Sequence, residues 1–368
     1  MTKGTQRQTT GNTISQKQLE EFVKITAQLR EPLMVWGAPG IGKSNIIQQG
    51  ADDLFAGEYQ EYEVRNGRCF EKATGKYRTR PWCIEIRGSL IQSYDLIGIP
   101  EIVDGFTRWA PPVGSLLPPH NGRGGILFID ELMNSEDENV RQALLGLIND
   151  RAIGSYTLPE NWIIIAASNR AEDGTFAHQM GKHLGTRFWT HVVLEPNVDD
   201  WLARARKDGI DYRTIGYIQW RRDTLLVFDA NDRGNSFPCP RIWYKIAQLN
   251  DLPPSIRTPA IIGALGEATG QDYLTFLTNF EDLPSIKEIK NNPASAPLPK
   301  RLDTLYVLTS SLANIADFAS IAPFSEYLQR VSEEWQVLFF KECERLHPKL
   351  TKTRPFTEFR IKNGDLYI

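Results

Sequence analysis

The most constraining feature of this chain is a short glycine-rich stretch, GAPGIGKS, which runs from Gly37 to Ser44. An apolar run over residues 33–36 precedes it, and a helix-like run begins at Ser44. A tight turn needs one or two glycines, whereas three glycines and a closing Lys-Ser pair indicate that a ligand approaches the backbone closely. The spacing G-x-x-x-x-G-K-[ST] is that of a phosphate loop, in which backbone amides and a helix N-terminus face phosphate oxygens. The sequence therefore predicts a strand, a phosphate loop and a helix in this order.

The loop as a whole is the predicted site for ATP. Its members are Gly37, Ala38, Pro39, Gly40, Ile41, Gly42, Lys43 and Ser44. Lys43 is expected to neutralise the β- and γ-phosphate oxygens, and the Ser44 hydroxyl to ligate Mg²⁺. The structural alternative is a coincidental glycine turn, which the position between a strand and a helix disfavours.

A second element places two adjacent carboxylates after a buried strand. The stretch GILFIDE ends in Asp130 and Glu131, at the strand end where a parallel sheet presents its binding edge. We expect Asp130 to hold Mg²⁺ through water, and Glu131 to orient or deprotonate the attacking water. A solvated acidic start to a helix, favoured by the helix dipole, is the alternative.

A third apolar run, IIIAASN, ends in a polar side chain at Asn169. An asparagine beside Glu131 could fix the attacking water without carrying a charge of its own. The alternative is a turn-forming asparagine, since this residue type is common in turns.

Strands and helices alternate through the first half of the chain, which predicts an α/β fold with a parallel sheet covered on both faces. The expected strands cover residues 33–36, 82–86, 125–129 and 162–167. The expected helices run from a capping box at Ser15 and Gln18 to about Arg30, from Ser44 onward, and over 138–147.

Composition is that of a soluble globular protein with two or three domains. Its 368 residues are 41% hydrophobic and 24% charged, and the formal net charge of -3 argues against a generally basic nucleic-acid binder. The four cysteines are scattered without a C-x-x-C pair, which predicts reduced thiols in a cytoplasmic protein. The polar N-terminus lacks the apolar core of a signal peptide, and no apolar run approaches the roughly 20 residues that span a bilayer.

The character of the chain changes after Pro196, where helical spacing continues without a strand signal. We place the nucleotide-binding α/β domain at residues 1–196, with inserts near 57–81 and 88–120. A helical lid at 197–290 and a C-terminal helical segment at 291–368 follow, joined by the proline-rich stretch NNPASAPLP.

With these elements in order, the sequence resembles the AAA+ ATPases, and in particular their MoxR branch. The stretches that carry the likeness are IEIRGSLIQSYDLIGIPE, RWAPPVGSLLP, LINDRAIGSYTLPENWIIIAASNRAEDG, LGTRFWTHVVLEP and SFPCPRIW. The resemblance covers most of the chain and implies a P-loop ATPase core followed by an all-α lid.

The resemblance also assigns roles to individual polar residues. It implies that Asn169 is the sensor, that Arg187 is an arginine finger reaching a neighbouring subunit's site, and that Arg241 is the lid arginine contacting the γ-phosphate. A salt-bridged surface residue is the alternative for Arg187, and an equivalent structural role is the alternative for Arg241. Other arginines remain candidates for these roles; they are Arg141, Arg151 and Arg170.

Members of the MoxR branch form ring hexamers and remodel protein partners as chaperones, often with a partner that carries a von Willebrand factor A domain. The resemblance implies the same here. Two alternatives stay open. One is a DNA-associated motor or loader, and the other is a nucleotide-gated scaffold with little turnover.

Two segments depart from the core pattern. The first insert contains the turn pair Asn66-Gly67 and six basic residues between Arg65 and Arg80, which could bind nucleic acid or an acidic protein face. A solvated hairpin is the favoured interpretation. The second insert resembles the branch's segment bordering the central pore; its Trp109 is predicted to be a packed core residue, with a substrate-gripping aromatic as the alternative.

Overall fold

The computed structural model describes residues 11–65, 67–110, 116–154, 156–170, 180, 185–229, 234, 236–281, 286–299 and 301–363. The chain divides into two units between Asn197 and Val198, and a short segment that begins at Asp229 groups with the first unit. Each unit has its own buried apolar side chains. The division follows the change from alternating strands and helices to helices alone.

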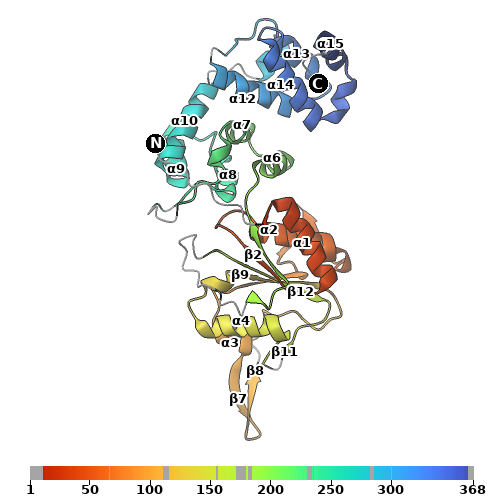
Figure 1. Cartoon of the computed structure of the whole chain (residues 1–368), viewed down its shortest axis with the longest axis vertical. Helices are drawn as coiled ribbons and strands as arrows, with labels where there is room; N and C mark the ends of the chain where they lie inside the picture. The colour runs from red at the N-terminus through yellow and green to blue at the C-terminus, as the bar shows by residue number, and fades with distance from the viewer. Residues whose placement is uncertain are drawn as a thin grey trace. The chain divides into compact units, whose positions relative to one another are not determined.

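A six-stranded sheet forms the centre of the first unit (Figure 1). Its strand order is β1-β13-β2-β12-β9-β6, and every neighbouring pair is parallel. The bounds are β1 Thr13–Ile14, β2 Leu33–Trp36, β6 Cys83–Arg87, β9 Gly125–Asp130, β12 Trp162–Ser168 and β13 Thr190–Leu194. Every residue of β12 is buried, as expected for a central strand of a sheet covered on both faces.

Helices cover the two faces of this sheet. On one face lie α1 (Gln16–Leu29) and α2 (Lys43–Phe55), and on the other lie α3 (Ser93–Ile97) and α4 (Glu138–Asp150), as Figure 1 shows. The apolar face of α4 packs on the sheet through Leu144 and Ile148. Two short 3-10 helices also lie among the described residues of this unit, η1 (Ala56–Glu58) and η2 (Leu132–Asn134).

The predicted fold class, an α/β parallel-sheet P-loop core followed by a helical part, is confirmed. The four predicted strands are present within one residue of their expected bounds. The capping box at the start of α1 is also present: the Ser15 hydroxyl accepts from the Gln18 amide, and the Gln18 side chain accepts from the Ser15 amide. Two strands of the central sheet were not predicted, β1 and β13. Both are short, and β13 begins with the polar pair Thr190 and His191, which hides its strand pattern.

Three small antiparallel elements extend from the core. The first insert forms the sheet β3-β4-β5 (Tyr62–Arg65, Arg68–Glu71, Tyr77–Arg78), in which the expected hairpin joins β3 to β4. The turn residue Asn66 lies outside the described residues, whereas Gly67 has a φ of 70°, in the left-handed region. The other two are the hairpins β7-β8 (Ile99–Val103, Phe106–Ala110) and β10-β11 (Ala152–Ile153, Tyr156–Thr157).

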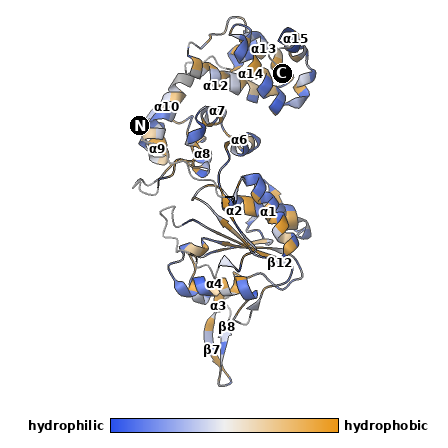
Figure 2. Ribbon diagram, in the orientation of Figure 1, coloured by the Kyte–Doolittle hydropathy of each residue, from blue (hydrophilic) through white to orange (hydrophobic). Residues whose placement is uncertain are grey.

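The prediction that Trp109 is a core residue is wrong. It lies on β8, and 45% of it is exposed, together with 81% of Ile102 and 78% of Phe106 on the same hairpin. Figure 2 shows hydrophobic colouring on the β7-β8 hairpin, which extends away from the sheet of its own unit. An apolar side chain on a two-stranded hairpin has no second layer to bury it, which the sequence pattern does not reveal.

The second unit consists of helices and loops in its described residues. The helices are α6 Val198–Lys207, α7 Tyr212–Trp220, η4 Arg222–Thr224, α8 Pro240–Ile246, α9 Pro254–Leu265, α10 Glu267–Glu281, α11 Ile286–Asn291, α12 Leu302–Asn314, α13 Ile321–Leu328, α14 Glu333–Leu346, η5 Pro348–Lys352 and α15 Arg354–Lys362. One apolar cluster joins α6 to α10, and Val307 of α12 packs into it. A second cluster joins α11 to α15.

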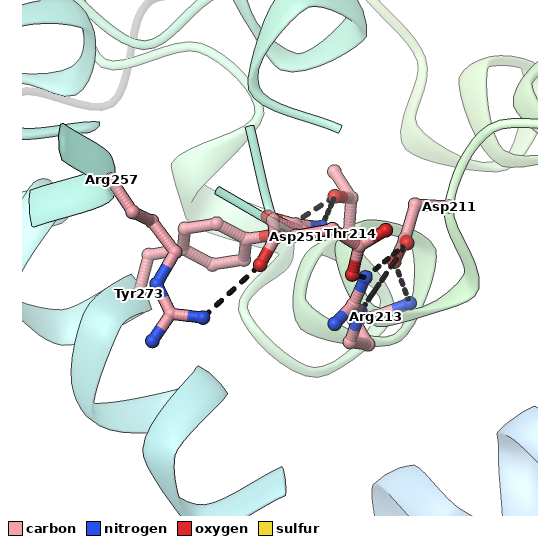
Figure 3. A network of polar contacts seen from close by, with 7 residues as sticks. Asp211, Arg213, Thr214, Asp251, Arg257 and Tyr273 are labelled. Atoms are coloured by element: carbon pink, nitrogen blue, oxygen red, sulfur yellow. Dashed lines mark hydrogen bonds and ion pairs between the residues drawn. The ribbon is translucent and has the colours of Figure 1, made fainter. Parts of the chain in front are cut away.

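A closed ring of hydrogen bonds lies inside the first of these helical groups (Figure 3). The Tyr273 hydroxyl donates to Asn250 Oδ1 (2.9 Å), and Asn250 Nδ2 donates to the Thr214 hydroxyl (3.1 Å). The Thr214 and Tyr273 oxygens are 2.8 Å apart, so the Thr214 hydroxyl completes the ring as the donor. All three residues are at most 1% exposed. Because each of the three side chains is hydrogen-bonded to the other two, burying them costs less than burying unpaired polar groups.

Two further findings concern the whole chain. All four cysteines are buried free thiols. In the part of the chain that the structure describes, no helix combines the length and the apolar character that a membrane crossing requires.

Candidate functional site

The glycine-rich loop lies between the end of β2 and the start of α2, at the carboxyl edge of the sheet. Gly42 has a φ of 100°, which a residue with a side chain rarely adopts, and it caps α2 without any side-chain hydrogen bond. A Cβ on Gly37 would lie 2.8 Å from the Leu194 carbonyl oxygen, so only glycine fits against β13 here. The first turn of α2 contains no acidic residue, which leaves its amides and the positive end of its dipole for an anion.

Lys43 lies inside the loop and is only 7% exposed. Its Nζ donates to the carbonyl oxygens of Gly37 (2.7 Å) and Ala38 (3.1 Å) and to Asn169 Oδ1 (3.0 Å). These three acceptors match the three donors of an ammonium group. The structure thus places Asn169, which follows β12, in contact with the Lys43 ammonium group at the start of α2.

Ser44 and Asp130 are joined directly, because the Ser44 hydroxyl donates to Asp130 Oδ2 at 2.7 Å. The other carboxylate oxygen, Oδ1, accepts from the Glu131 amide at 3.0 Å. Burial raises the pKa of Asp130, although the Ser44 hydrogen bond and the Lys43 charge oppose this shift. A hydroxyl and a carboxylate that converge in this way are the hard oxygen ligands that Mg²⁺ accepts, so the residues fit that ion.

Glu131 follows β9 in a strained conformation, with a φ of 56°. Its carbonyl approaches the backbone of the neighbouring segment so closely that a Cβ on Gly88 would lie 2.9 Å from it. Its side-chain Oε2 accepts a hydrogen bond from the Ser89 hydroxyl. The left-handed backbone and the Ser89 contact together determine where this carboxylate lies.

Ser89 is a site residue that the sequence analysis missed. It lies two residues beyond the end of β6, which is the neighbour of β9 in the sheet. No motif marks it, since its contact with Glu131 spans 42 positions in the chain. The strand order, had it been known, would have provided the signal, because residues that follow adjacent parallel strands meet at one edge.

The predicted arginines lie in different places. Arg187 follows Gly185 in the first unit, and its Nη1 donates to the Leu145 carbonyl oxygen of α4 at 2.6 Å. Arg241 is the second residue of α8, in the helical unit. Arg151 donates to the carbonyl oxygens of Pro159 and Trp162, at the amino end of β12, the end opposite Asn169. Of the other two candidates, Arg141 donates to the Ser135 carbonyl oxygen, and Arg170 directly follows Asn169.

The basic segment of the first insert has much of its charge matched locally. Arg80 makes two hydrogen bonds to Asp52 of α2, and the side chains are only 13% and 15% exposed. Arg78 pairs with Glu71 (3.2 Å), and Lys72 donates to the Gln60 carbonyl oxygen. This pairing favours the solvated-hairpin interpretation over a phosphate-binding surface.

Comparisons with known proteins add a likeness to solved structures. No protein-family model matches the chain, and no curated protein matches it by sequence. NtrX from Brucella abortus in complex with ADP matches with 14% identity and a TM-score of 0.36, covering 91% of this chain and 67% of that one. A P216G mutant of Thermotoga maritima RuvB matches with 15% identity and a TM-score of 0.36, covering 85% and 86%.

A third structure, the ORC2 protein of Aeropyrum pernix in ADPNP-ADP complexes, matches with 9% identity and a TM-score of 0.39. It covers 90% of this chain and 85% of that one. Likeness at this level adds no residue roles. The functional argument therefore depends on the site geometry itself.

Proposed function

We propose that this protein is a Mg²⁺-dependent AAA+ ATPase of the MoxR type. It hydrolyses ATP to ADP and phosphate within a ring oligomer, as a hexamer, and uses the reaction to remodel a protein partner. From the family resemblance, we expect the partner to carry a von Willebrand factor A domain.

One observation carries the proposal. Side chains of the phosphate loop, which follows β2, meet side chains from the ends of two further parallel strands, β9 and β12. Lys43 contacts Asn169, and Ser44 contacts Asp130, beside Glu131. A cation, a hydroxyl, an amide and two carboxylates in this arrangement meet the requirements of phosphoryl transfer to water. A coincidental glycine turn does not require these side chains to lie close together.

In the proposed mechanism, the amides of the loop and α2 bind the phosphates, and Lys43 exchanges its loop carbonyl contacts for phosphate oxygens. Ser44 and Asp130 hold Mg²⁺, which neutralises charge on the phosphate oxygens when bound. Glu131 releases its Ser89 contact and accepts a proton from the attacking water. Asn169 holds that water in line through its amide.

The coupling to a partner is assigned to the β7-β8 hairpin, whose exposed apolar residues suit contact with an unfolded or loosely folded segment. Arg187 is assigned to the neighbouring subunit's site. Arg241 is assigned to the γ-phosphate of the ATP bound by its own subunit. A fixed guanidinium adds charge stabilisation where the transition state develops negative charge.

The test is Glu131→Gln. We expect phosphate release to fall by at least about 100-fold, because the general base is lost, while the Kd for ATP by calorimetry changes less than about twofold. Glu136→Gln is the matched control, since Glu136 is an exposed carboxylate in the following loop. Unchanged turnover in Glu131→Gln would remove this residue from the mechanism.

The same assays separate the alternatives. Negligible turnover in the wild type, with nucleotide-dependent assembly, would favour a nucleotide-gated scaffold. DNA-stimulated turnover and binding that weakens steeply with salt would favour a DNA-associated motor.

A further inference from the structure

A single imidazole joins two segments of the nucleotide-binding unit. Trp36 is the last residue of β2 and directly precedes the phosphate loop, whereas His191 is the second residue of the neighbouring strand β13. The register pairs His191 with Met34, so the side chains of Met34, Trp36 and His191 share one face of the sheet. The contact between Trp36 and His191 spans 155 positions.

The hydrogen bonds define the protonation state of His191. The Trp36 indole Nε1, which can only donate, lies 3.0 Å from His191 Nδ1. Nδ1 therefore carries the lone pair, and the ring proton is on Nε2, which donates to the Gly185 carbonyl oxygen at 2.8 Å. Only the neutral Nε2–H tautomer satisfies both partners, because a proton on Nδ1 would face the indole N–H.

Packing holds the ring in this orientation. The Phe188 ring lies edge-on to it, with centroids 5.3 Å apart and an interplanar angle of 70°. The Trp36 ring lies nearly parallel to it, at 6.2 Å and 15°. A Cβ on Gly185 would already contact His191 Nε2 at 3.4 Å, so the segment approaches the ring closely.

The segment that His191 holds is the one that carries Arg187. The Gly185 carbonyl, two residues before Arg187, also accepts from the Phe188 amide at 3.3 Å, which closes a turn around the arginine. The other partner of His191, Trp36, belongs to the strand that leads into Gly37. The imidazole thus connects the turn around Arg187 to the entry of the phosphate loop.

We propose that His191 is a positioning residue for the ATPase reaction: its neutral tautomer fixes the turn from Gly185 to Phe188, and with it Arg187, relative to the phosphate loop. This inference rests on the proposed function, which assigns Arg187 to a neighbouring site. His191 itself contacts no reacting atom, and its effect passes through Gly185 and Trp36.

Two substitutions separate its two hydrogen bonds. In His191→Asn the amide oxygen occupies roughly the place of Nδ1, so the Trp36 contact survives and the Gly185 contact is lost. In His191→Gln the amide nitrogen occupies roughly the place of Nε2, so the Gly185 contact survives. His347→Asn is the matched control, because His347 also contacts a backbone carbonyl, that of Asn314, in the helical unit.

We expect His191→Asn to lower kcat about tenfold while KM for ATP changes less than about twofold, the loss of one positioning hydrogen bond. His191→Gln should recover most of the rate, and His347→Asn should match the wild type. In protein that already carries Arg187→Ala, His191→Asn should lower kcat by less than about a further twofold. The effects of two substitutions are not additive when both residues act through the same group.

A second readout does not use turnover. In ¹⁵N-histidine-labelled protein, which contains five histidines, the His191 signals are identified by their loss in His191→Asn. The nitrogen shifts should show a protonated Nε2 and an unprotonated Nδ1. A proton on Nδ1 would overturn the inference whatever the rates.

The kinetic outcomes also distinguish the two proposals. Absence of wild-type turnover would refute the proposed function and this inference with it. The inference alone would be overturned if the wild type hydrolyses ATP, Arg187→Ala loses this activity and His191→Asn keeps it. A loss in His191→Asn that adds in full to that of Arg187→Ala would also overturn it, as would equal losses in His191→Asn and His191→Gln.

Discussion

Glu131 combines a strained backbone with a held side chain. A left-handed backbone at a residue with a Cβ costs about 1–3 kcal/mol, and the surrounding structure must impose it. The Ser89 hydroxyl occupies one oxygen of the carboxylate. In the proposed mechanism the carboxylate turns toward the attacking water, and this turn gives up the Ser89 hydrogen bond. The resting structure therefore places a barrier in front of hydrolysis.

Ser89→Ala tests this barrier. We expect the basal rate of ATP hydrolysis to rise about twofold to tenfold, because a hydrogen bond to a charged group stabilises the resting position. The Kd for ATP should not change. Ser93→Ala, a serine four positions further on at the start of α3, serves as the control. A lower rate in Ser89→Ala would instead mean that Ser89 holds Glu131 in its working position.

At the scale of elements, the two units use polar groups differently. In the helical unit, the ring of Thr214, Asn250 and Tyr273 is closed and fully buried, so it fixes α7, the loop before α9 and α10 together (Figure 3). Beside it, Arg213 pairs with Asp211 and Asp251. These pairs raise the pKa of the guanidinium, and the hydrogen bonds to Asp211 make the largest contribution. These contacts support the structure of the helical unit.

Tyr273→Phe should destabilise the helical unit by about 1–3 kcal/mol, because it removes one donor and one acceptor from the buried ring. The midpoint of urea unfolding measures this. Tyr77→Phe is the matched control, since Tyr77 is 63% exposed, and it should stay within about 0.5 kcal/mol of the wild type. Equal midpoints for the two variants would show that water replaces the lost bonds.

The β7-β8 hairpin gives the second prediction at this scale. Trp109→Ala should leave the thermal midpoint within about 1 °C of the wild type, because the side chain packs against little. Trp162→Ala is the contrast, since Trp162 is fully buried and its loss should cost about 3–5 kcal/mol. A large destabilisation by Trp109→Ala would restore the core interpretation that the structure contradicts.

At the scale of the whole molecule, the proposed mechanism needs a second subunit, because it assigns Arg187 to a neighbouring site. Arg187 donates to the carbonyl of Leu145 within its own chain. To serve a neighbouring site it would exchange this contact for one across the interface, and hydrolysis would then depend on assembly.

Mixing two strongly impaired variants tests that dependence. Arg187→Ala keeps the phosphate loop, and Lys43→Ala keeps the arginine, so mixed rings contain sites with both. Random mixing at equal amounts should restore up to about a quarter of the wild-type rate, since half of the loops and half of the neighbouring arginines are intact. Each variant alone should keep only a small residual rate. No recovery in mixed rings would contradict a role for Arg187 in trans.

The sequence by itself determined the features that a few neighbouring residues encode. The phosphate loop needs glycines, a lysine and a serine at fixed spacing, and the capping box at Ser15 needs only Gln18 three positions later. The central strands were also predictable, because a sheet buried on both faces requires continuous apolar runs.

Only the tertiary structure decided which distant residues meet. Ser89 with Glu131, and His191 with Trp36, come together because parallel strands far apart in the chain lie side by side, and no local pattern encodes that order. Exposure was decided in the same way. An apolar residue such as Trp109 is buried only where a second layer covers it, and a basic residue such as Arg80 is neutralised only where packing brings an acid to it.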